Sequence, residues 1–376
     1  MAEVAPLHLT LLMGRQIVVP VGQQVTDALL SAQITVTAGQ RSGFQLSFDL
    51  SRTGVINRTL LPNGGFDPQV RVVLAITVRG VPHVLMDGVI IRQEVSVTGT
   101  PGQSTLTVTG EDLTVLMDLE EREGVPFPAM SPAARVAAII GRYAQYGITP
   151  LVVPELVPQT PMPTQRIDFQ KGTDLGYLTE LAKANGYVFY LDPGPVPGVS
   201  RGFWGPEVRL GTPQHAINVN MDHLSTVDQL TFGFDGTARE EPVARIQIPV
   251  TKTSVLLPVP EVSVLRPPLA LRPAPALKKK VVADMAKKDA AQALAETIAK
   301  VVESSDAVTG SGQLDVLRYG AVLRPRELVG VRGAGITYDG LYYVKSVTHN
   351  LQRGAYTQNF TLAREGLISL LPTVIP

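Results

Sequence analysis

Asp87-Gly88-Val89-Ile90-Ile91 is followed, after a turn, by Thr105-Leu106-Thr107-Val108-Thr109-Gly110-Glu111-Asp112-Leu113. The pattern occurs again near the other end of the chain, as Asp339-Gly340-Leu341-Tyr342-Tyr343, a turn, and Asn359-Phe360-Thr361-Leu362-Ala363-Arg364-Glu365-Gly366-Leu367. The spacing between the two copies is two residues longer for the second strand than for the first, and a longer hairpin turn accounts for this difference. Because all hairpins share alternation and glycine turns, convergence is the alternative to duplication. Duplication predicts two related β domains in each chain, so that three chains in a closed ring would present six similar units.

The residues around the first copy, up to about Leu116, have the pattern of short antiparallel strands. Apolar and polar residues alternate in 33–37, 44–50 and 104–110, which is the period of a half-buried strand. Two β-branched runs, 70–78 and 84–97, lie between them, and Asp87-Gly88 favours a hairpin turn inside the second run. Strands at this spacing predict a barrel or a sandwich.

The residues around the second copy also predict strands. The expected strands are 207–210, 216–220, 227–234, 243–250, 338–348 and 356–363. They are interrupted by a stretch too rich in proline for a helix or a central strand, which predicts an extended arm. Its prolines are Pro258, Pro260, Pro267, Pro268, Pro273 and Pro275. A Lys/Ala-rich helix is expected from Val281 to Ser304, with Lys278, Lys279 and Lys280 as its solvated start and a polyanion contact as the alternative.

Helices are expected between the two β regions. Ser131-Pro132 has the form of an N-cap with proline in the first turn, and Gly147 would end that helix. Thr173 or Asp174 can cap a second helix, whose apolar face would be Leu175, Leu178, Leu181 and Ala182. Asn185-Gly186 would end it before a strand at 187–191.

Composition excludes several classes of protein. The 376 residues carry a formal net charge of +0, which argues against a general nucleic-acid binder. Charged residues are 18%, against about 25% in an average soluble domain, which favours large protein–protein contacts. The absence of cysteine excludes disulfide scaffolds and thiolate sites and fits synthesis in a reducing cytosol. The sequence has no secretory signal at its start and no apolar run of the ~20 residues that span a bilayer.

No motif predicts catalysis, a cofactor or a metal ion. The five histidines lack metal-site spacing, and Glu120–Glu123 is most simply a solvated helix end. Gly198-Val199-Ser200-Arg201-Gly202 matches the nucleophile elbow of serine hydrolases by letter, but prolines precede it and no helix pattern follows it. Gly330–Gly335 has its glycines in the wrong order for a dinucleotide loop. Trp204, the sole tryptophan, could stack on a sugar, but packing in a core at a domain junction is the simpler interpretation.

The order of these parts resembles the phage late control protein D family, the baseplate hubs of contractile tails. The same architecture occurs in the amino-terminal part of type VI secretion valine-glycine repeat spike proteins. The resemblance rests on the helix beginning Ser131-Pro132, on the polar residue, capped helix, glycine and aromatic strand of 167–191, and on the final hairpin at 340–349 and 354–360.

This resemblance implies a mainly β fold with an α+β insertion. The expected domains are a first tube-like β-barrel (1–116), an α+β middle domain (117–200), a second tube-like β-barrel (201–250 and 313–371), and a Pro-rich arm with its helix (251–312). The arm is absent from the family pattern and is expected to pack on a neighbouring chain or a baseplate partner. The candidate ring-forming hairpin residues are Val89, Ile91, Leu106, Val108, Tyr342, Val344, Phe360 and Leu362. Pro267, Pro268 and Lys278–Lys280 are the candidate partner contacts of the arm.

The resemblance also implies a function without catalysis. Such a hub is a homotrimer that adapts a three-fold spike to a six-fold inner tube, and it nucleates tube assembly. Its partners are the inner tube protein, a separate spike protein and other baseplate components, with no specific nucleic acid and no membrane insertion. It would be made in the bacterial cytoplasm and incorporated into a tail or injection particle. The alternatives are a β-rich receptor- or glycan-binding tail component and, third, a hydrolase.

Overall fold

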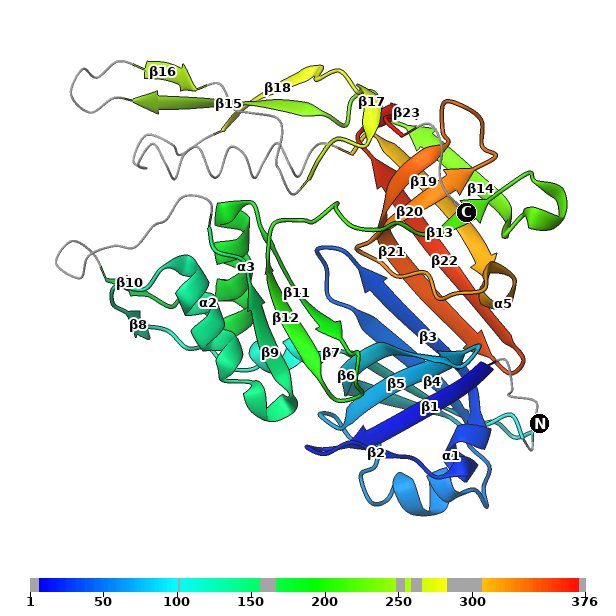
Figure 1. Cartoon of the computed structure of the whole chain (residues 1–376). Helices are drawn as coiled ribbons and strands as arrows, with labels where there is room; N and C mark the ends of the chain where they lie inside the picture. Colours follow the sequence, from blue (N-terminus) through cyan, green and yellow to red (C-terminus); the bar gives the residue numbers. More distant parts are fainter. Residues whose placement is uncertain are drawn as a thin grey trace.

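The computed structural model describes residues 7–100, 102–155, 167–247, 254–257, 266–282 and 306–371. Its main feature is a 13-stranded sheet to which both ends of the chain contribute (Figure 1). The predicted fold class, mainly β with an α+β insertion, is confirmed. The two β regions are joined in one sheet because β3 from the first pairs with β21 from the second.

Residues 7–112 form the first half of this sheet. Its elements are β1 (Leu7–Gly14), β2 (Val19–Pro20), α1 (Gln23–Ala28), β3 (Leu29–Thr37), β4 (Gly43–Asp49), η1 (Ile56–Leu60), β5 (Arg71–Val78), β6 (Val81–Ser96) and β7 (Thr105–Asp112). Residues 214–369 form the second half. Its elements are β13 (Gln214–Asn218), η4 (Asp222–Leu224), β14 (Val227–Phe234), β19 (Val308–Asp315), α5 (Val316–Tyr319), β20 (Leu328–Arg332), β21 (Gly340–Gln352), β22 (Ala355–Arg364) and β23 (Gly366–Ser369).

The two halves have the same strand order. Neighbouring strands in the first half are β3-β4-β7-β6-β5-β1, and in the second β14-β19-β22-β21-β20-β13. Each strand therefore has a counterpart at the same place in the chain order, and a short helix follows β4 and β19 alike (η1 and α5). One direction differs, because β1 is antiparallel to β5 whereas β13 is parallel to β20. The prediction of two related β units is confirmed in topology.

One hydrophobic core serves both halves. Ile34, Leu46 and Val108 of the first half belong to the same buried cluster as Val347 and Leu362 of the second. The alternation that predicted half-buried strands accounts for this, since every second residue of β3, β4 and β7 is buried. These three strands consequently have one apolar face, which packs in the core, and one polar face, whereas β5 is buried on both faces.

The middle domain has its own core around two helices. Its elements are η2 (Leu113–Met117), β8 (Pro126–Phe127), α2 (Pro132–Gly141), η3 (Ala144–Tyr146), β9 (Ile148–Val152), β10 (Asp168–Phe169), α3 (Asp174–Asn185), β11 (Val188–Pro193) and β12 (Ser200–Gly205). Ser131 caps α2 by accepting from the backbone N–H of Ala134, and Thr173 caps α3 by accepting from that of Gly176. Gly186 ends α3 with left-handed backbone, as predicted, whereas α2 ends at Gly141 and the left-handed Gly147 ends the short η3 that follows it.

The arm interrupts the second half between β14 and β19. Its described strands are β15 (Glu240–Gln247), β16 (Ser254–Leu257), β17 (Ala270–Pro273) and β18 (Lys278–Val282). β15, β16 and β18 form a separate sheet, and β17 pairs with β23 (Figure 1). The arm's own sheet thus begins at Glu240, ahead of the expected boundary at residue 250.

Three local expectations were wrong. Asp87-Gly88 makes no turn, because β6 runs through it and the turn lies at Arg79-Gly80, both with positive φ. Glu207–Leu210 is not a strand, since its charged residues belong to an ion cluster described below. Lys278–Lys280 do not start a helix, because they pair in parallel with Glu240–Pro242 of β15. The rest of the expected helix, residues 283–304, lies outside the described residues.

Candidate functional site

The junction between the halves shows how two such units join edge to edge. β21 pairs antiparallel with β3, from Ser346 opposite Thr37 to Gln352 opposite Ser31. On the polar face, the hydroxyls of Thr35 and Thr348 lie 3.1 Å apart. Gln33 Nε2 donates to Asn350 Oδ1 at 3.1 Å on the same face. Backbone pairing and matched polar side chains together define this register.

A buried histidine lies at this junction. His349, opposite Ile34, is fully buried, and its Nδ1 lies 2.8 Å from the hydroxyl of Tyr356. Gln358 approaches the same Nδ1 at 3.2 Å and exchanges hydrogen bonds with the backbone of Leu323. Burial, with a smaller contribution from His83, lowers the pKa of His349 to about 3. The imidazole is therefore neutral at physiological pH.

β14 and the outer part of β6 each have an open strand edge in the part of the chain that the structure describes, as β2 and β13 also do. β5 pairs with β6 only from Val81 to Val89, so Arg92–Ser96 pair with β7 alone. β14 pairs with β19 alone. Apolar side chains are exposed at both edges, since Val95 is 46% and Val97 77% exposed beside β6, and Phe234 at the end of β14 is 42% exposed. An unprotected apolar edge favours pairing with another chain.

The predicted hairpin residues lie where the hairpins meet the core. Ile91 is 43% exposed, and the other side chains are buried within this chain. Those buried side chains are Val89, Leu106, Val108, Tyr342, Val344, Phe360 and Leu362. They pack the hairpins onto the core. Because they are buried, any contact with another copy would be made by the strand edges and by side chains that point outward. These edges are not visible in the sequence, because an open edge depends on which distant strands pair.

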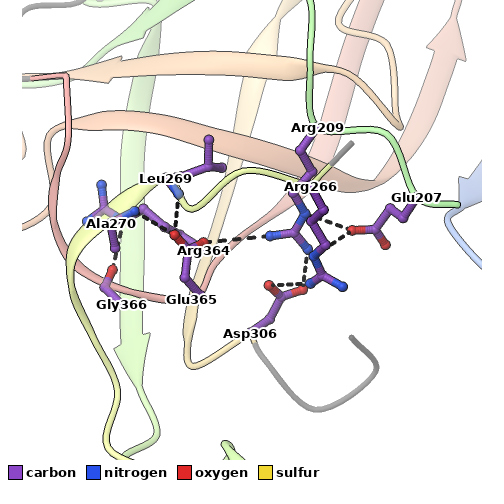
Figure 2. Close-up of polar contacts among 9 residues, drawn as sticks. All are labelled: Glu207, Arg209, Arg266, Leu269, Ala270, Asp306, Arg364, Glu365 and Gly366. Carbon is purple, nitrogen blue, oxygen red and sulfur yellow. Dashed lines mark hydrogen bonds and ion pairs between the residues drawn. The ribbon is translucent and has the colours of Figure 1, made fainter. Parts of the chain in front are cut away.

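A buried ion cluster holds the base of the arm. Arg209 is 1% exposed, and it donates to Glu207 at 2.7 Å and to Asp306 at 2.8 Å (Figure 2). Arg266 donates to Asp306 at 3.1 Å. Glu365, beyond β22, accepts from the backbone N–H groups of Leu269 and Ala270 (Figure 2). The cluster therefore joins the middle of the arm, residues 266–270, and its carboxyl end at Asp306 to the second half of the sheet.

The charges of this cluster depend on one another. Burial disfavours the charged form of Asp306, but attraction by Arg209 and Arg266 outweighs it and holds the pKa of the Asp306 carboxyl below its usual value. Removing one member would leave a buried charge without compensation, which typically costs about 3–5 kcal/mol. The arm thus leaves the sheet from a rigid base.

The predicted contact residues of the arm lie in two places, with Pro267 and Pro268 beside the ion cluster and Lys278–Lys280 on β18. Pro267 is half-buried and Pro268 exposed, next to Arg266. Lys278 is exposed at the start of β18, and Lys279 and Lys280 continue that strand. Arg239 beside β15 donates to the carbonyl of Ala274 at 2.7 Å. Strands β15 and β18 are therefore tied to the base, and contact with a partner remains a prediction.

Ser200 is a structural residue at the contact with the middle domain. It is 1% exposed, and its Oγ donates to Asp87 Oδ2 at 3.1 Å. Asp87 also accepts from Arg71 at 2.7 and 2.6 Å, and Arg71 reaches the carbonyl of Gly198 at 2.9 Å. Ser200 begins β12 after a β11–β12 turn, so the strand-then-helix context of a nucleophile elbow is absent there. The motif therefore spans the β11–β12 turn and the start of β12.

The aromatic and acidic residues of the middle domain are also used in packing. Trp204 is fully buried, with its ring 4.7 Å from that of Tyr187, so it cannot be an exposed sugar platform. Asp174 is buried and accepts from Arg142, Tyr143 and Gln170. Among the described residues, no group of three or more histidines and carboxylates could hold a metal ion. No helix in the described ranges is long and apolar enough to cross a membrane.

The fold is shared with tail proteins of known structure. A tail protein from Neisseria meningitidis MC58 has a TM-score of 0.63 at 14% identity, covering 97% of this chain and 98% of its own. The 43 kDa tail protein of prophage MuSo2 from Shewanella oneidensis has a TM-score of 0.58 at 13% identity, covering 96% and 98%. The E. coli c3393 protein, a type VI secretion component described as similar to the T4 tail proteins gp27 and gp5, has a TM-score of 0.54 at 12% identity, covering 93% and 77%.

No family model matches the sequence, and no curated protein matches it. The structural likeness extends over almost the whole chain. The chain therefore has the fold of these phage tail and type VI secretion proteins. At the level of fold, this confirms the resemblance seen in the sequence.

Proposed function

We propose that this chain is a structural baseplate hub of a contractile phage tail or contractile injection system. In this proposal it is a homotrimer that adapts a three-fold spike to a six-fold inner tube and nucleates assembly of that tube. One observation carries the proposal: the chain joins its two equivalent halves through one pair of strand edges, and leaves the equivalent pair open.

The open edges are counterparts of the joined ones. Within the chain, β21 of the second half pairs with β3 of the first. By strand order, β6 is the counterpart of β21, and β14 is the counterpart of β3. β6 of one copy would therefore pair with β14 of the next, in the same way as the internal junction. Because each copy supplies two units, three copies would close a ring of six.

The internal register predicts the contacts at this seam. Matching the two copies of the repeated sequence pattern residue by residue gives Val97 the position of His349, and the strand pairings then give Phe234 the position of Ile34. His349 and Ile34 lie directly opposite each other, so Val97 would lie opposite Phe234. Both are exposed apolar side chains of the open edges, and pairing would remove both from water.

The other parts of the proposal follow from the resemblance and the shared fold. The hub would contact the inner tube protein on one side of the ring, a separate spike protein on the other, and further baseplate components. The candidate nucleophile Ser200 is buried in a structural hydrogen bond, which supports a role without catalysis. The protein would be made in the bacterial cytoplasm and incorporated into a tail or injection particle.

Engineered disulfides test the seam, because the chain has no cysteine of its own. Directly opposite residues of antiparallel strands have Cβ atoms about 4.5–5.5 Å apart, close to disulfide geometry. Under oxidation, Val97→Cys/Phe234→Cys is expected to give a covalent trimer on a non-reducing gel. Thr35→Cys/Thr348→Cys, across the internal junction, should instead oxidise within one chain.

Val97→Cys/Asp228→Cys is the matched control, because Asp228 lies at the other end of β14. It should not crosslink efficiently. Light scattering on the unmodified protein should give the mass of three chains. A stable monomer at assembly concentrations, or equal crosslinking by both cysteine pairs, would contradict the proposal.

A further inference from the structure

The loop between β20 and β21, residues 333–339, carries a nearly fully exposed isoleucine. Ile336 is 86% exposed, more than any other large apolar side chain in the described ranges. In the first half, β5 and β6 are joined by Arg79-Gly80 alone, so this loop belongs to the second half only. Single exposed apolar side chains are common on protein surfaces. The surroundings of Ile336 therefore decide whether it has a partner.

Buried contacts hold this loop in one conformation. Arg364 is fully buried and donates to the carbonyl oxygens of Thr337 at 2.9 Å and Asp339 at 3.0 Å. The carboxylate of Asp339 accepts from the backbone N–H of Ala334 at 2.7 Å. A residue on a rigid element loses less conformational freedom when it binds than one on a mobile loop. Ile336 is therefore preorganised for contact.

Two exposed leucines adjoin this loop at the base of the arm. Ile368 of β23 donates its backbone N–H to the carbonyl of Thr337 at 3.0 Å. Leu271, which is 63% exposed, belongs to β17, and β17 pairs with β23. Leu370, also exposed, directly follows β23. These contacts bring Leu271, Ile336 and Leu370 onto adjoining segments, and we call the three side chains the apolar patch.

The apolar patch lies next to the open edge of β14, on the side of the sheet that faces the core. The ring of Tyr338 stacks on that of Phe232 with 5.0 Å between their centres, and both pack against the hydrophobic core. Phe234, two residues further along β14, is the exposed apolar side chain at the end of that strand. The patch is therefore continuous with the edge where the proposed seam would form.

The proposed seam would extend past the end of β14. Val97 of the next copy would lie opposite Phe234, so Val95 would lie opposite Gly236 in the antiparallel register. Gly236 belongs to the turn that leads into the arm, and β14 has already ended at Phe234. Strand pairing alone would therefore leave Val95 without cover from the copy beside it.

The internal junction shows that this position is normally covered. The counterpart of Val95 in the repeated pattern is Val347, which is fully buried and is paired with Val36 of β3. Val95 pairs with Leu106, a core residue, so Val95 lies on the core side of the sheet, as the apolar patch does. Ile91, four residues earlier on β6, is exposed as well. The next copy thus offers exposed apolar side chains beyond the end of β14.

We propose that the apolar patch packs against Val95 and Ile91 of the next copy, as a second contact of the seam on its core side. The inference rests on the proposed trimeric ring and adds a contact that the paired strands do not make. A second copy is the occupant that the observations favour, because its exposed apolar residues would lie at the same end and on the same side of β14 as the patch. Burial would remove both apolar surfaces from water.

Chemical crosslinking tests this contact, since the chain has no cysteine of its own. Val95→Cys/Ile336→Cys, treated with a short bismaleimide, is expected to give a ladder on a denaturing gel that ends at three chains. Val95→Cys/Ile17→Cys is the matched control, because Ile17 is also highly exposed but lies between β1 and β2 of the first half. The control should remain a single chain on the gel.

A substitution measures the contribution of the contact to assembly. Ile336→Asp should leave folding unchanged, because the side chain is exposed, and should raise the concentration at which the trimer dissociates by about tenfold or more, because a carboxylate would be desolvated at the seam. Ile336→Leu should behave as the parent, and so should Ile17→Asp. Sedimentation over a dilution series gives these concentrations, and thermal melting checks folding.

The outcomes separate this contact from the ring itself. If Val97→Cys/Phe234→Cys gives a covalent trimer but Val95→Cys/Ile336→Cys crosslinks no better than its control, the inference is overturned and the hub proposal stands. If Ile336→Asp trimers are as stable as the parent but fail to attach to the baseplate, the patch serves another partner and the inference is overturned. If neither cysteine pair links the chains, the contact and the ring are both overturned.

Discussion

At the scale of single residues, the neutral imidazole of His349 links the stability of the junction to pH. His349 contributes its hydrogen bonds only in the neutral form, because a charge there would be buried beside Tyr356 and Gln358. Among the described residues, His83 is the titrating group that also lowers the pKa of His349, and His83 itself lies 3.2 Å from Arg324. Acid therefore acts directly on the contact between the two halves.

We expect stability to fall as the pH drops from about 6.5, the pKa of histidine in the unfolded chain, towards the folded value of about 3. Above 6.5 the folded and unfolded chains are both neutral at this site, so the contribution is fully present there. Each pH unit in this window costs up to roughly 1.4 kcal/mol, or about 2 kcal/mol at pH 5. Urea unfolding at pH 7.5 and pH 5 measures this loss.

His349→Gln should lose about 2 kcal/mol less than the parent over the same pH change, because it has no imidazole to protonate. His8→Gln is the control, since His8 is exposed, and it should follow the parent. Identical pH dependence of His349→Gln and the parent would contradict this assignment.

At the scale of elements, the arm is the part that distinguishes the two halves. The first half joins β3 to β4 through Ala38–Ser42, whereas the second half inserts the arm between the counterparts β14 and β19. The ion cluster of Arg209, Asp306 and their neighbours fixes the point where the arm leaves the sheet. The separate sheet of β15, β16 and β18 extends from that point.

Arg209→Ala should release the arm base while leaving the main sheet folded. Glu207 and Asp306 would then be buried with one cation fewer, at a cost of about 3–5 kcal/mol. Limited proteolysis should therefore cut within residues 240–306 faster than in the parent, with far-ultraviolet circular dichroism nearly unchanged. Arg201→Ala removes an exposed ion pair with Asp192 and should leave the cutting rate unchanged.

Deleting the arm tests its expected role as a contact to a neighbouring chain or baseplate partner. Replacing residues 240–305 with a short turn of the kind that joins β3 to β4 should weaken trimer formation or attachment to the baseplate. Sedimentation measures the first effect, and electron microscopy of assembled particles measures the second. If trimers and baseplates formed normally without the arm, its role as a contact would be wrong.

The sequence predicts elements better than it predicts how they pair. Alternation located β3, β4, β7 and β22, and capping residues located α2 and α3, because these signals are local. The turn predicted at Asp87-Gly88 was wrong, because Asp87 lies within a strand and accepts hydrogen bonds from Arg71 and Ser200. Ser200 is distant in the sequence, so this contact has no local signal. The helix start predicted at Lys278–Lys280 was wrong, because these residues form a strand by pairing with β15, which is distant in the sequence. The open edges are equally nonlocal, since Arg92–Ser96 differ from a paired strand only in what lies beside them.

At the scale of the whole molecule, one apolar seam is expected to decide the assembly state. Phe234 is exposed in the single chain, so Phe234→Asp should leave folding unchanged and convert the trimer to monomer, because a carboxylate would be buried at the seam. Leu224→Asp changes another exposed apolar residue, on η4, and should remain trimeric. Light scattering and thermal melting check the two variants. A trimeric Phe234→Asp protein would exclude this seam.

The insertion between β14 and β19 has a consequence for whatever binds the outside of such a ring. The inner wall would repeat every sixty degrees, but an arm would occur at alternate positions only. A partner that binds the arms would find three equivalent sites, and a partner that binds the strands would find six. A single polypeptide could thus offer two different symmetries to two different neighbours without any conformational change.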